Sequence, residues 1–598
     1  MRKTSLKLLA CLLVIAIIGT LAAGCASAPA APSSTASSEA ASEVASSGTA
    51  AKNYDKFLTI DVFDNKANYQ GIQPGWYAKV VKDKFNMELN IIAPNVAGGN
   101  DTLFQTRSAA GELGDLIMIG SEGGRLADCV KADLMYDITD MVSKSQNLIN
   151  YQAAIDNIKS MINSDKVYAI PSECSLSSPL EATDGNDPTF GVYLRWDYYS
   201  ELGCPEINTF EDVLPVLKQM QDKHPTSDSG QKAYAVSMFK DWDGNTMCLG
   251  KNPAALYGYD LDQSYFTLIN PDGKSQYVLE DNSLYYRGLK FFFQANQLGI
   301  LDPDSSTQNY DTFDAKYRDG GVFFDLWPWH CQGAYNTQEN KAAGKGFMYV
   351  PVKDVSILGR GCNTLGNNYI IGVGSKAEDP QRMVDFIDWL YSPEGIMYAS
   401  AQTNSTCGPE GLTWEMKDNE PALTDFGKKV FSGDDKAEMP AEWGGGTYKD
   451  GMSQLNYTSV VNKDINPANN APYNFMLWSS YLKDNTTPLD KSWQDEMKAL
   501  TTMEYIKSNN QFVVAANNGW IIPQVPTDVD AIRTQCAQII RDESWKMVFA
   551  KDEAEFNALY KGMQDTVKGL GVEQVLNWEK TNIVEPLAAR YEKAKSGQ

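Results

Sequence analysis

The sequence contains only two histidines, His224 and His330, among 598 residues. With so few imidazoles, a histidine-rich metal site or a histidine-based catalytic triad is not expected. His330 stands beside Cys331, but neighbouring side chains seldom chelate one ion, so we expect no metal there. The G-x-S-x-G, H-E-x-x-H and P-loop patterns are absent as well. The sequence therefore offers no recognisable motif for catalysis.

Basic residues are also scarce, with 52 lysines and arginines against 76 aspartates and glutamates and a formal net charge of -24. This acidity argues against nucleic acid as a partner and means that an anionic lipid surface repels the body of the protein. No pair of cysteines has the C-x-x-C spacing of a zinc or redox site. The cysteines beyond residue 25 predict no specific disulfide; they are Cys129, Cys174, Cys204, Cys248, Cys331, Cys362, Cys407 and Cys536.

Long apolar runs are missing apart from one near the N-terminus. That run, from Leu8 to Ile18, follows three basic residues and is shorter than the roughly 20 residues that a membrane-spanning helix needs. These features are typical of a secretion signal. The small residues Ala22, Ala23 and Gly24 then lead directly to Cys25.

The stretch ending in Cys25 resembles the lipobox of bacterial lipoproteins, with Ala22 where Leu, Val or Ile is usual. The resemblance implies cleavage after residue 24 and a diacylglycerol on Cys25; the alternative is an ordinary cut with Cys25 incidental. Two acyl chains give stable anchoring. Residues 25–53 are rich in Ala and Ser and predict a flexible tether. Loss of residues 1–24 removes three basic residues, which moves the net charge from -24 to -27.

The remaining chain alternates between strand and helix patterns. "FLTIDVF" from Phe57, "LNIIAP" from Leu89 and "DLIMIG" from Asp115 predict three strands of a βαβ opening. In "EDPQRMVDFIDWLYS", Asp379 is a plausible N-cap and Pro380 a first-turn residue. Roughly 540 mature residues exceed one hydrophobic core, so we expect two large lobes.

Several segments, taken in chain order, resemble the family 1 extracellular solute-binding lipoproteins of ABC importers, in particular their large oligosaccharide-binding branch. The segments are "GELGDLIMIGS", "LMYDITDMV", "KVYAIP", "VYLRWDYYSELGCPEINTFEDVLPVLKQM", "NPDGKSQYVLEDNSLYYRGLKFFFQANQLGILDPD", "FDAKYRDGGVFFDLWPW" and "MVDFIDWLYSPEGIMYASAQTNSTCGPEG". Together they span nearly the whole mature chain.

The resemblance implies an α/β, two-lobed periplasmic-binding-protein-like fold of type II, with a hinge and a ligand cleft between the lobes. We place lobe 1 at 54–178 plus 348–405 and lobe 2 at 179–347 plus 406–598. Ligand contact with both lobes then favours the closed state. The implied protein is a lipid-anchored monomer on the outer face of the bacterial cytoplasmic membrane, which captures a carbohydrate and delivers it to the transmembrane subunits of an ABC permease.

Some large members of that family carry a calcium loop at the position of "DKHPTSDSGQKAYAVS". Here Asp222 and Asp228 have few further carboxylates beside them, fewer than a cation wanting six to eight oxygens prefers. We therefore expect neither calcium nor another metal or cofactor.

A sugar ring has an apolar C–H face and polar edges, so a sugar site calls for aromatic rings beside carboxylates and amides. "FDLWPWH" follows a predicted strand and supplies Asp325, Trp327 and Trp329, although Pro328 suggests that the strand has already ended. We expect at least one of the two tryptophans to face the ligand; the alternative is packing in the core.

Further candidates follow other predicted strands or lie in polar turns: Asp64, Asn68, Trp76, Ser121, Glu122, Trp242, Asp243, Tyr473, Trp478, Asn518 and Trp520. For each of these a packed aromatic or a solvated turn is an equal alternative. Arg195 and Asp197 are expected to brace a lobe. Two classes rival a non-enzymatic binding protein: a glycoside hydrolase, which needs two positioned carboxylates, and a ligand-sensing partner of a membrane receptor. A peptide or another polar solute also remains open as the ligand.

Overall fold

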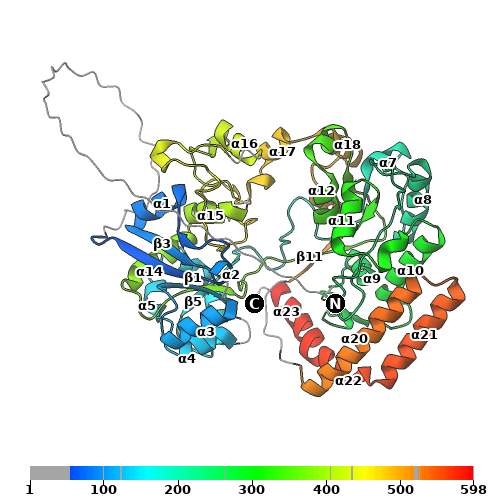
Figure 1. The fold of residues 1–598 in the computed structure, drawn as a ribbon, viewed down its shortest axis with the longest axis horizontal. Helices are drawn as coiled ribbons and strands as arrows, with labels where there is room; N and C mark the ends of the chain where they lie inside the picture. Colours follow the sequence, from blue (N-terminus) through cyan, green and yellow to red (C-terminus); the bar gives the residue numbers. More distant parts are fainter. Residues whose placement is uncertain are drawn as a thin grey trace, which may run out of the picture. The chain divides into compact units, whose positions relative to one another are not determined.

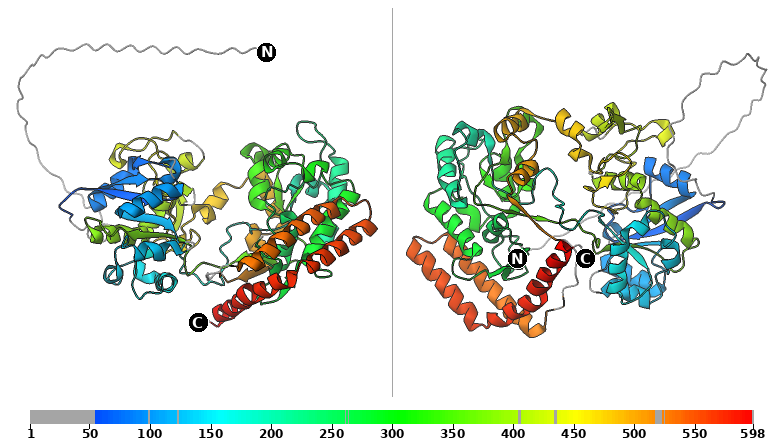
Figure 2. Two further views of the ribbon diagram at one scale, coloured as in Figure 1. Left: turned by 60° about the horizontal axis from the view of Figure 1, so that its bottom comes forward. Right: turned by 180° about the vertical axis from the view of Figure 1, so that it is seen from behind.

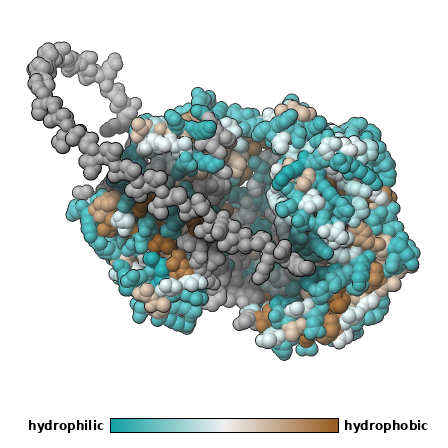
Figure 3. All heavy atoms as spheres, viewed as in Figure 1, coloured by the Kyte–Doolittle hydropathy of each residue, from teal (hydrophilic) through white to brown (hydrophobic). Residues whose placement is uncertain are grey.

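The computed structural model describes residues 54–596, apart from 98–99, 122–123, 261, 263, 404–405, 433–435, 517–522 and 524. Within these residues the buried apolar side chains form two large cores, one rich in sheet and one rich in helix (Figure 1). We call the parts of the chain around them the first and the second lobe. The surface seen in Figure 3 is largely hydrophilic, as the acidic composition requires. Among the described residues, no helix is both long and apolar enough to cross a bilayer.

The first lobe is organised by a six-stranded sheet with the order β2-β3-β1-β4-β12-β5. β1 runs parallel to β3 and β4, which confirms the predicted βαβ opening, whereas β12 is antiparallel to β4 and β5. The strands are β1 Leu58–Asp64, β2 Gly71–Ile72, β3 Met87–Ile92, β4 Leu116–Gly120, β5 Ala169–Pro171 and β12 Tyr369–Val373.

Side chains alternate between the two faces of this sheet, and both faces are covered. Leu116 and Met118 of β4 join the larger core, while Ile117 and Ile119 join a smaller one on the other face. The larger core takes side chains from α1 Gly75–Phe85, α14 Pro380–Leu390 and α15 Pro393–Ala399. The smaller core takes them from α4 Arg125–Lys131 and, in part, from α6 Gln152–Met161. Both faces are buried, which explains why β4 is apolar throughout.

The helix signals in the sequence are confirmed. α14 starts where expected, because the Asp379 side chain accepts a hydrogen bond from the Arg382 N–H at 3.1 Å and Pro380 occupies the first turn. A capping box formed by Thr209 and Asp212 precedes α8 Val213–Lys223.

The second lobe has a small antiparallel sheet, β10-β6-β9, surrounded by helices. Its strands are β6 Tyr193–Arg195, β9 Phe324–Asp325 and β10 Phe347–Tyr349. The helices include α10 Leu284–Gln297, α11 Tyr310–Arg318, α12 Pro328–Tyr335, α18 Pro488–Met497, α20 Thr527–Val548, α21 Glu553–Gly569, α22 Val572–Glu579 and α23 Glu585–Lys595. α20 and α21 pack side by side as a long helical pair (Figure 2).

Asp272 and Gly273 form the turn of a hairpin between β7 Thr267–Ile269 and β8 Ser275–Tyr277. Gly273 adopts a φ of 82°, and a Cβ there would lie 2.8 Å from Cβ of Ala588 on α23. The turn therefore needs glycine both for its backbone conformation and for its close approach to the last helix.

The expected brace between Arg195 and Asp197 is also present. Arg195 is fully buried, and its guanidinium donates to both carboxylate oxygens of Asp197 at 3.0 and 2.7 Å. It also lies 4.1 Å from the ring centroids of Tyr198 and Tyr335.

Four segments run side by side where the chain passes between the lobes. β11 Ile357–Arg360 pairs in parallel with β17 Phe512–Ala515, and bridges join Ala182 to Gly361 and Cys174 to Val460. The eight described cysteines are all free, and all except the half-buried Cys204 are buried.

The lobe boundaries differ from the expected ones in two places. Residues 348–357 pack in the second lobe, because β10 pairs with β6. Residues 407–478 pack in the first lobe, where Tyr448 stacks on Trp76 at a centroid distance of 5.5 Å. This stretch contains little regular structure, so its sequence has no periodicity that could have assigned it to a core.

Candidate functional site

Five aromatic side chains from separate parts of the second lobe meet at its surface. Trp242 stacks on Tyr310 with ring centroids 4.5 Å apart and on Trp329 with centroids 6.0 Å apart, each pair inclined by 23°. The ring centroid of Trp327 lies 5.6 Å from that of Trp242. The ring centroid of Phe239 lies 5.0 Å from that of Trp242, with the two rings nearly perpendicular. We call Tyr310, Trp242 and Trp329 the aromatic surface, because Trp327 and Phe239 lie beneath it.

Exposure separates these rings into two groups. Trp242 is 41% exposed and Trp329 53%, whereas Trp327 is 5% exposed and Phe239 1%. Within the described part of the chain, neither indole N–H of Trp242 and Trp329 has a hydrogen-bond partner. Two large aromatic side chains are thus partly open to solvent and carry free indole donors, which is a combination that a sugar ring can use.

The local structure explains why Trp327 and Trp329 differ. β9 ends at Asp325, Trp327 is the N-cap residue of α12, and Pro328 begins that helix. The strand has therefore ended before the tryptophans, as Pro328 suggested, and strand alternation no longer places them on one side. The turn into α12 directs Trp327 inward and leaves Trp329 outside.

Asp325 fixes this turn from below. Its Oδ1 accepts a hydrogen bond from the Trp327 N–H at 2.9 Å, and its Oδ2 lies 2.6 Å from Nδ1 of His330. The carboxylate is 5% exposed and the imidazole 2%. Asp325 was expected to contact ligand; the structure instead gives it a supporting position, because both of its oxygens are already engaged by the protein.

His330 joins Asp325 to a second carboxylate. Nε2 of His330 lies 3.3 Å from Oδ1 of Asp314, without the alignment of a hydrogen bond, and Asp314 also pairs with Arg318. The imidazole stacks on Phe313 with centroids 4.9 Å apart and lies 5.7 Å from the ring of Trp329. The first turns of α11 and α12 are therefore linked by buried polar groups directly under the aromatic surface.

Tyr310 is the first residue of α11, and its backbone N–H donates to Oδ2 of Asp241 at 2.9 Å. Burial raises the pKa of Tyr310, and the nearby charges of Asp314 and Asp325 add to the increase. The phenol consequently keeps its proton at physiological pH and can donate a hydrogen bond.

Asp243 holds the turn that carries Trp242. Its oxygens accept hydrogen bonds from the Cys248 N–H at 2.9 Å and from the indole N–H of Trp545 on α20 at 2.7 Å. Burial raises the pKa of its carboxyl, and the bond from Trp545 opposes that increase. Asp243 was expected to contact ligand, but its side chain instead ties the turn to α20.

The first-lobe candidates do not form a comparable surface. Asp64 is fully buried and accepts hydrogen bonds from the backbone of Lys66 and Ala67 and from the hydroxyl of Tyr369 at 2.6 Å. Burial raises the pKa of this carboxyl, while these donors oppose the rise. Asp64 thus shapes the loop after β1, and Asn68 is exposed in that loop. Ser121 is buried at the end of β4, and its hydroxyl has no partner.

Three aromatic candidates belong to the first core, which corrects the expectation that they contact ligand. Trp76 is fully buried and donates its indole N–H to the Tyr448 carbonyl at 3.0 Å. Trp478 is 2% exposed and donates to the Pro472 carbonyl at 2.7 Å; Tyr473 is 4% exposed. Their surfaces are covered by their own lobe, so none is available for stacking.

Four candidates lie outside the described residues: Cys25, Glu122, Asn518 and Trp520. Conversely, sequence reasoning missed Tyr310, Phe239 and the supporting role of His330. An aromatic residue at the start of a helix, as in "QNYDTF", carries no signal for a site unless its neighbours in space are known.

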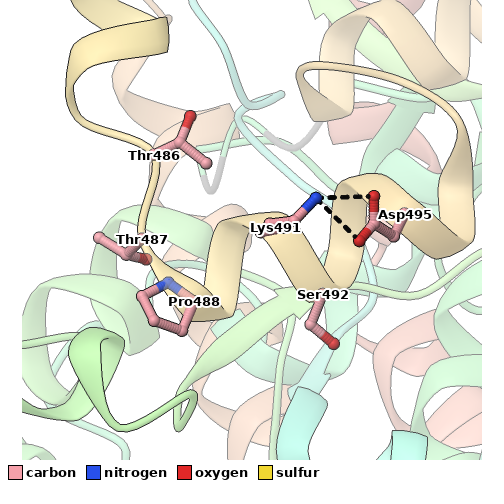
Figure 4. A pocket seen from close by; sticks show the side chains of 6 residues that line it. All are labelled: Thr486, Thr487, Pro488, Lys491, Ser492 and Asp495. Atoms are coloured by element: carbon pink, nitrogen blue, oxygen red, sulfur yellow. Dashed lines mark hydrogen bonds and ion pairs between the residues drawn. The ribbon is translucent and has the colours of Figure 1, made fainter.

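Two other features give no competing site. Among the described residues, no cluster of three or more His, Cys, Asp or Glu side chains could hold a metal ion. An open pocket of about 510 Å³ lies along α18 and is lined by Thr486, Thr487, Pro488, Lys491, Ser492 and Asp495 (Figure 4). Its two charged residues pair with each other at 3.1 Å and none of its lining residues is aromatic.

No known protein family profile and no curated relative matches the sequence. Solved structures do match. An "HMO binding" solute-binding protein associated with an ABC transporter, from Bifidobacterium longum infantis, is 13% identical with a TM-score of 0.51 over 89% of this chain and 99% of its own. An extracellular solute-binding protein from Bifidobacterium longum subsp. infantis is 13% identical with a TM-score of 0.52, over 90% and 99%.

The alginate-binding protein AlgQ2 is 14% identical with a TM-score of 0.50, over 88% of this chain and 98% of its own. At such low identity these similarities establish architecture alone. The protein therefore has the two-lobed α/β fold of extracellular solute-binding proteins, as the sequence predicted.

Proposed function

We propose that the protein is the substrate-binding component of an ABC importer and captures a carbohydrate, an oligosaccharide in particular. The observation that carries this proposal is the aromatic surface, where Trp242 and Trp329 expose 41% and 53% of their area and leave their indole N–H groups free. Large aromatic rings that lie together on the surface of a soluble protein mark an interaction site. The fold supports the proposal, since solved structures that share it include an alginate-binding protein and the "HMO binding" solute-binding protein.

A hydrolase receives less support. A glycosidase needs one carboxyl group as acid and a second as base or nucleophile, both open to the substrate. Asp241 and Asp311 beside the rings are exposed and lack the apolar surroundings that suit a carboxyl group to act as a general acid. The two carboxylates under the aromatic surface, Asp314 and Asp325, are 6% and 5% exposed, and both contact His330. They support the rings and are not placed to reach a glycosidic bond.

A thermal-shift screen against oligosaccharides tests the proposal. A cognate sugar at about 100 times its dissociation constant should add about 2.7 kcal/mol to the free energy of unfolding. The sugar should be recovered unchanged after incubation. New reducing ends would instead identify a glycosidase, and a protein stabilised only by peptides would contradict carbohydrate as the ligand class.

The proposal also includes a lipid anchor on Cys25, which would hold the monomeric protein at the outer face of the cytoplasmic membrane, beside the permease subunits. Replacing the lipid-bearing residue, Cys25→Ser, should move the protein from the membrane fraction to the soluble fraction. Release of the wild-type protein by mild salt alone would contradict a covalent anchor, because salt weakens only electrostatic attachment.

A further inference from the structure

The charges around the aromatic surface are mostly negative. Five carboxylates lie next to its rings or in the turns that hold them: Asp241, Asp243, Asp311, Asp314 and Asp325. The basic groups that act on the same cluster are Lys240, Arg318 and Arg541. Carboxylates therefore outnumber lysines and arginines at this site, as they do in the whole chain.

Both arginines are already committed to the protein. Arg318 pairs with Asp314, while Arg541 donates to the Gly244 carbonyl and to the side chain of Gln538. A sugar carboxylate is best recognised by a guanidinium that offers two parallel N–H groups. The charge of Arg318 is thus balanced by Asp314, and Arg541 is engaged by the protein; with the exposed Lys240 counted as well, the five carboxylates exceed the three basic groups by two.

Two of the carboxylates face solvent beside the rings. Asp241 and Asp311 are exposed, and each directly adjoins a member of the aromatic surface in sequence, Trp242 and Tyr310. Asp241 is also fixed in place, since its Oδ2 accepts the Tyr310 N–H. A hydroxyl of a neutral sugar could donate to such a carboxylate, whereas a negative group on the sugar would be repelled by it.

We propose that the aromatic surface selects saccharides without negative charge and rejects uronates, although the fold is shared with an alginate-binding protein. This inference rests on the proposed function, because it concerns the ligand of the same site. Stacking on Trp242 and Trp329 supplies an attraction that any sugar ring can use, and the unbalanced Asp241 and Asp311 supply the discrimination.

The test uses matched pairs of oligosaccharides of equal length and linkage, with gluco, manno and galacto configurations. One member of each pair is neutral and the other carries a carboxylate at C6. Affinity is measured by calorimetry on the full mature protein at low ionic strength. For every pair that binds, we expect the neutral member to bind more tightly, by about fourfold for two unit charges acting at about 10 Å in water. A carboxylate member that binds equally well or better would overturn the inference and leave sugar binding intact.

Failure of the proposed function gives a different result. If no neutral and no acidic saccharide in these pairs or in the wider thermal-shift screen binds, sugar capture is contradicted and this inference falls with it. The two failures are thus distinguishable by whether any saccharide binds.

A charge-neutralising variant tests the named residues. In the double variant Asp241→Asn with Asp311→Asn, the side chain at 241 can still accept the Tyr310 N–H, but two negative charges are lost. At separations of about 10 Å in water, removing both charges should improve the affinity for an acidic sugar about fourfold relative to the affinity for its neutral partner, because only the acidic sugar is repelled by the two carboxylates. The matched control, Asp565→Asn with Glu573→Gln, makes the same charge change on α21 and α22 and should have a much smaller effect. Equal effects in the two variants would overturn the assignment to Asp241 and Asp311.

Discussion

Three buried tryptophans of the first lobe and the two exposed tryptophans of the aromatic surface in the second lobe show opposite hydrogen-bonding behaviour. In the first lobe, Trp76, Trp414 and Trp478 are all nearly fully buried, and each indole N–H donates to a backbone carbonyl at 2.7 to 3.0 Å. In the second lobe, Trp242 and Trp329 are exposed and have no such partner among the described residues. Burying an indole N–H without a hydrogen-bond partner costs free energy, whereas an exposed indole N–H can bond to water or to a ligand.

Among these five tryptophans, the indole hydrogen bond and the exposed fraction together separate the core residues from those open to a ligand. A tryptophan count or a position after a strand cannot do so. Trp327 is instructive because it is buried yet touches both Trp242 and Trp329. It supports the binding surface from within the core.

The largest expected effect is on folding in the first lobe. Trp76→Ala should lower the free energy of unfolding by about 3 to 5 kcal/mol, because it leaves a cavity and also strips the Tyr448 carbonyl of its donor. Chemical unfolding of the unliganded protein measures this loss. Trp478→Ala should lower the free energy of unfolding by a similar amount, for the same reason. A loss below about 1 kcal/mol for both variants would contradict the comparison between the lobes.

A smaller effect, confined to binding, is expected in the second lobe. Trp329→Ala should weaken the affinity for a sugar identified in the screen about tenfold, or about 1.4 kcal/mol, through lost stacking. The unfolding free energy should change by no more than about 0.5 kcal/mol, since the ring is 53% exposed. Trp327→Ala is the matched control and should lose both stability and affinity. If Trp329→Ala has a clearly lower melting temperature than the wild type, or binds the sugar with wild-type affinity, Trp329 is not part of the sugar site.

The smallest effect comes from a conservative change of the aromatic ring at one site in each lobe. Trp76→Phe should lose at least roughly 1 kcal/mol more stability than Trp329→Phe, since only the first change leaves a buried carbonyl without its donor and opens space in the core. Thermal unfolding of the two variants in parallel provides the measurement. Equal losses would contradict a stabilising role for the buried Trp76 ring and its hydrogen bond to Tyr448.

Much of the fold could be predicted from the sequence because its signals are local. The apolar run of β4, the Asp379 cap of α14 and the Asp-Gly turn between β7 and β8 each depend on a few neighbouring residues. The candidate site was predicted only in part. Trp242, Trp327 and Trp329 do meet, but Asp243 and Asp325 brace the backbone.

The sequence by itself therefore determined the order of strands and helices, their caps, the acidic surface and the presence of two cores, because periodicity, capping and composition act over short distances. Only the tertiary structure decided which tryptophans are available to a ligand. Trp76 is buried by Tyr448, which lies 372 residues away in the chain, while Trp242 is stacked by residues from the starts of α11 and α12. Burial of a side chain depends on what covers it, and such covering partners come from distant segments whose meeting leaves no pattern in the local sequence.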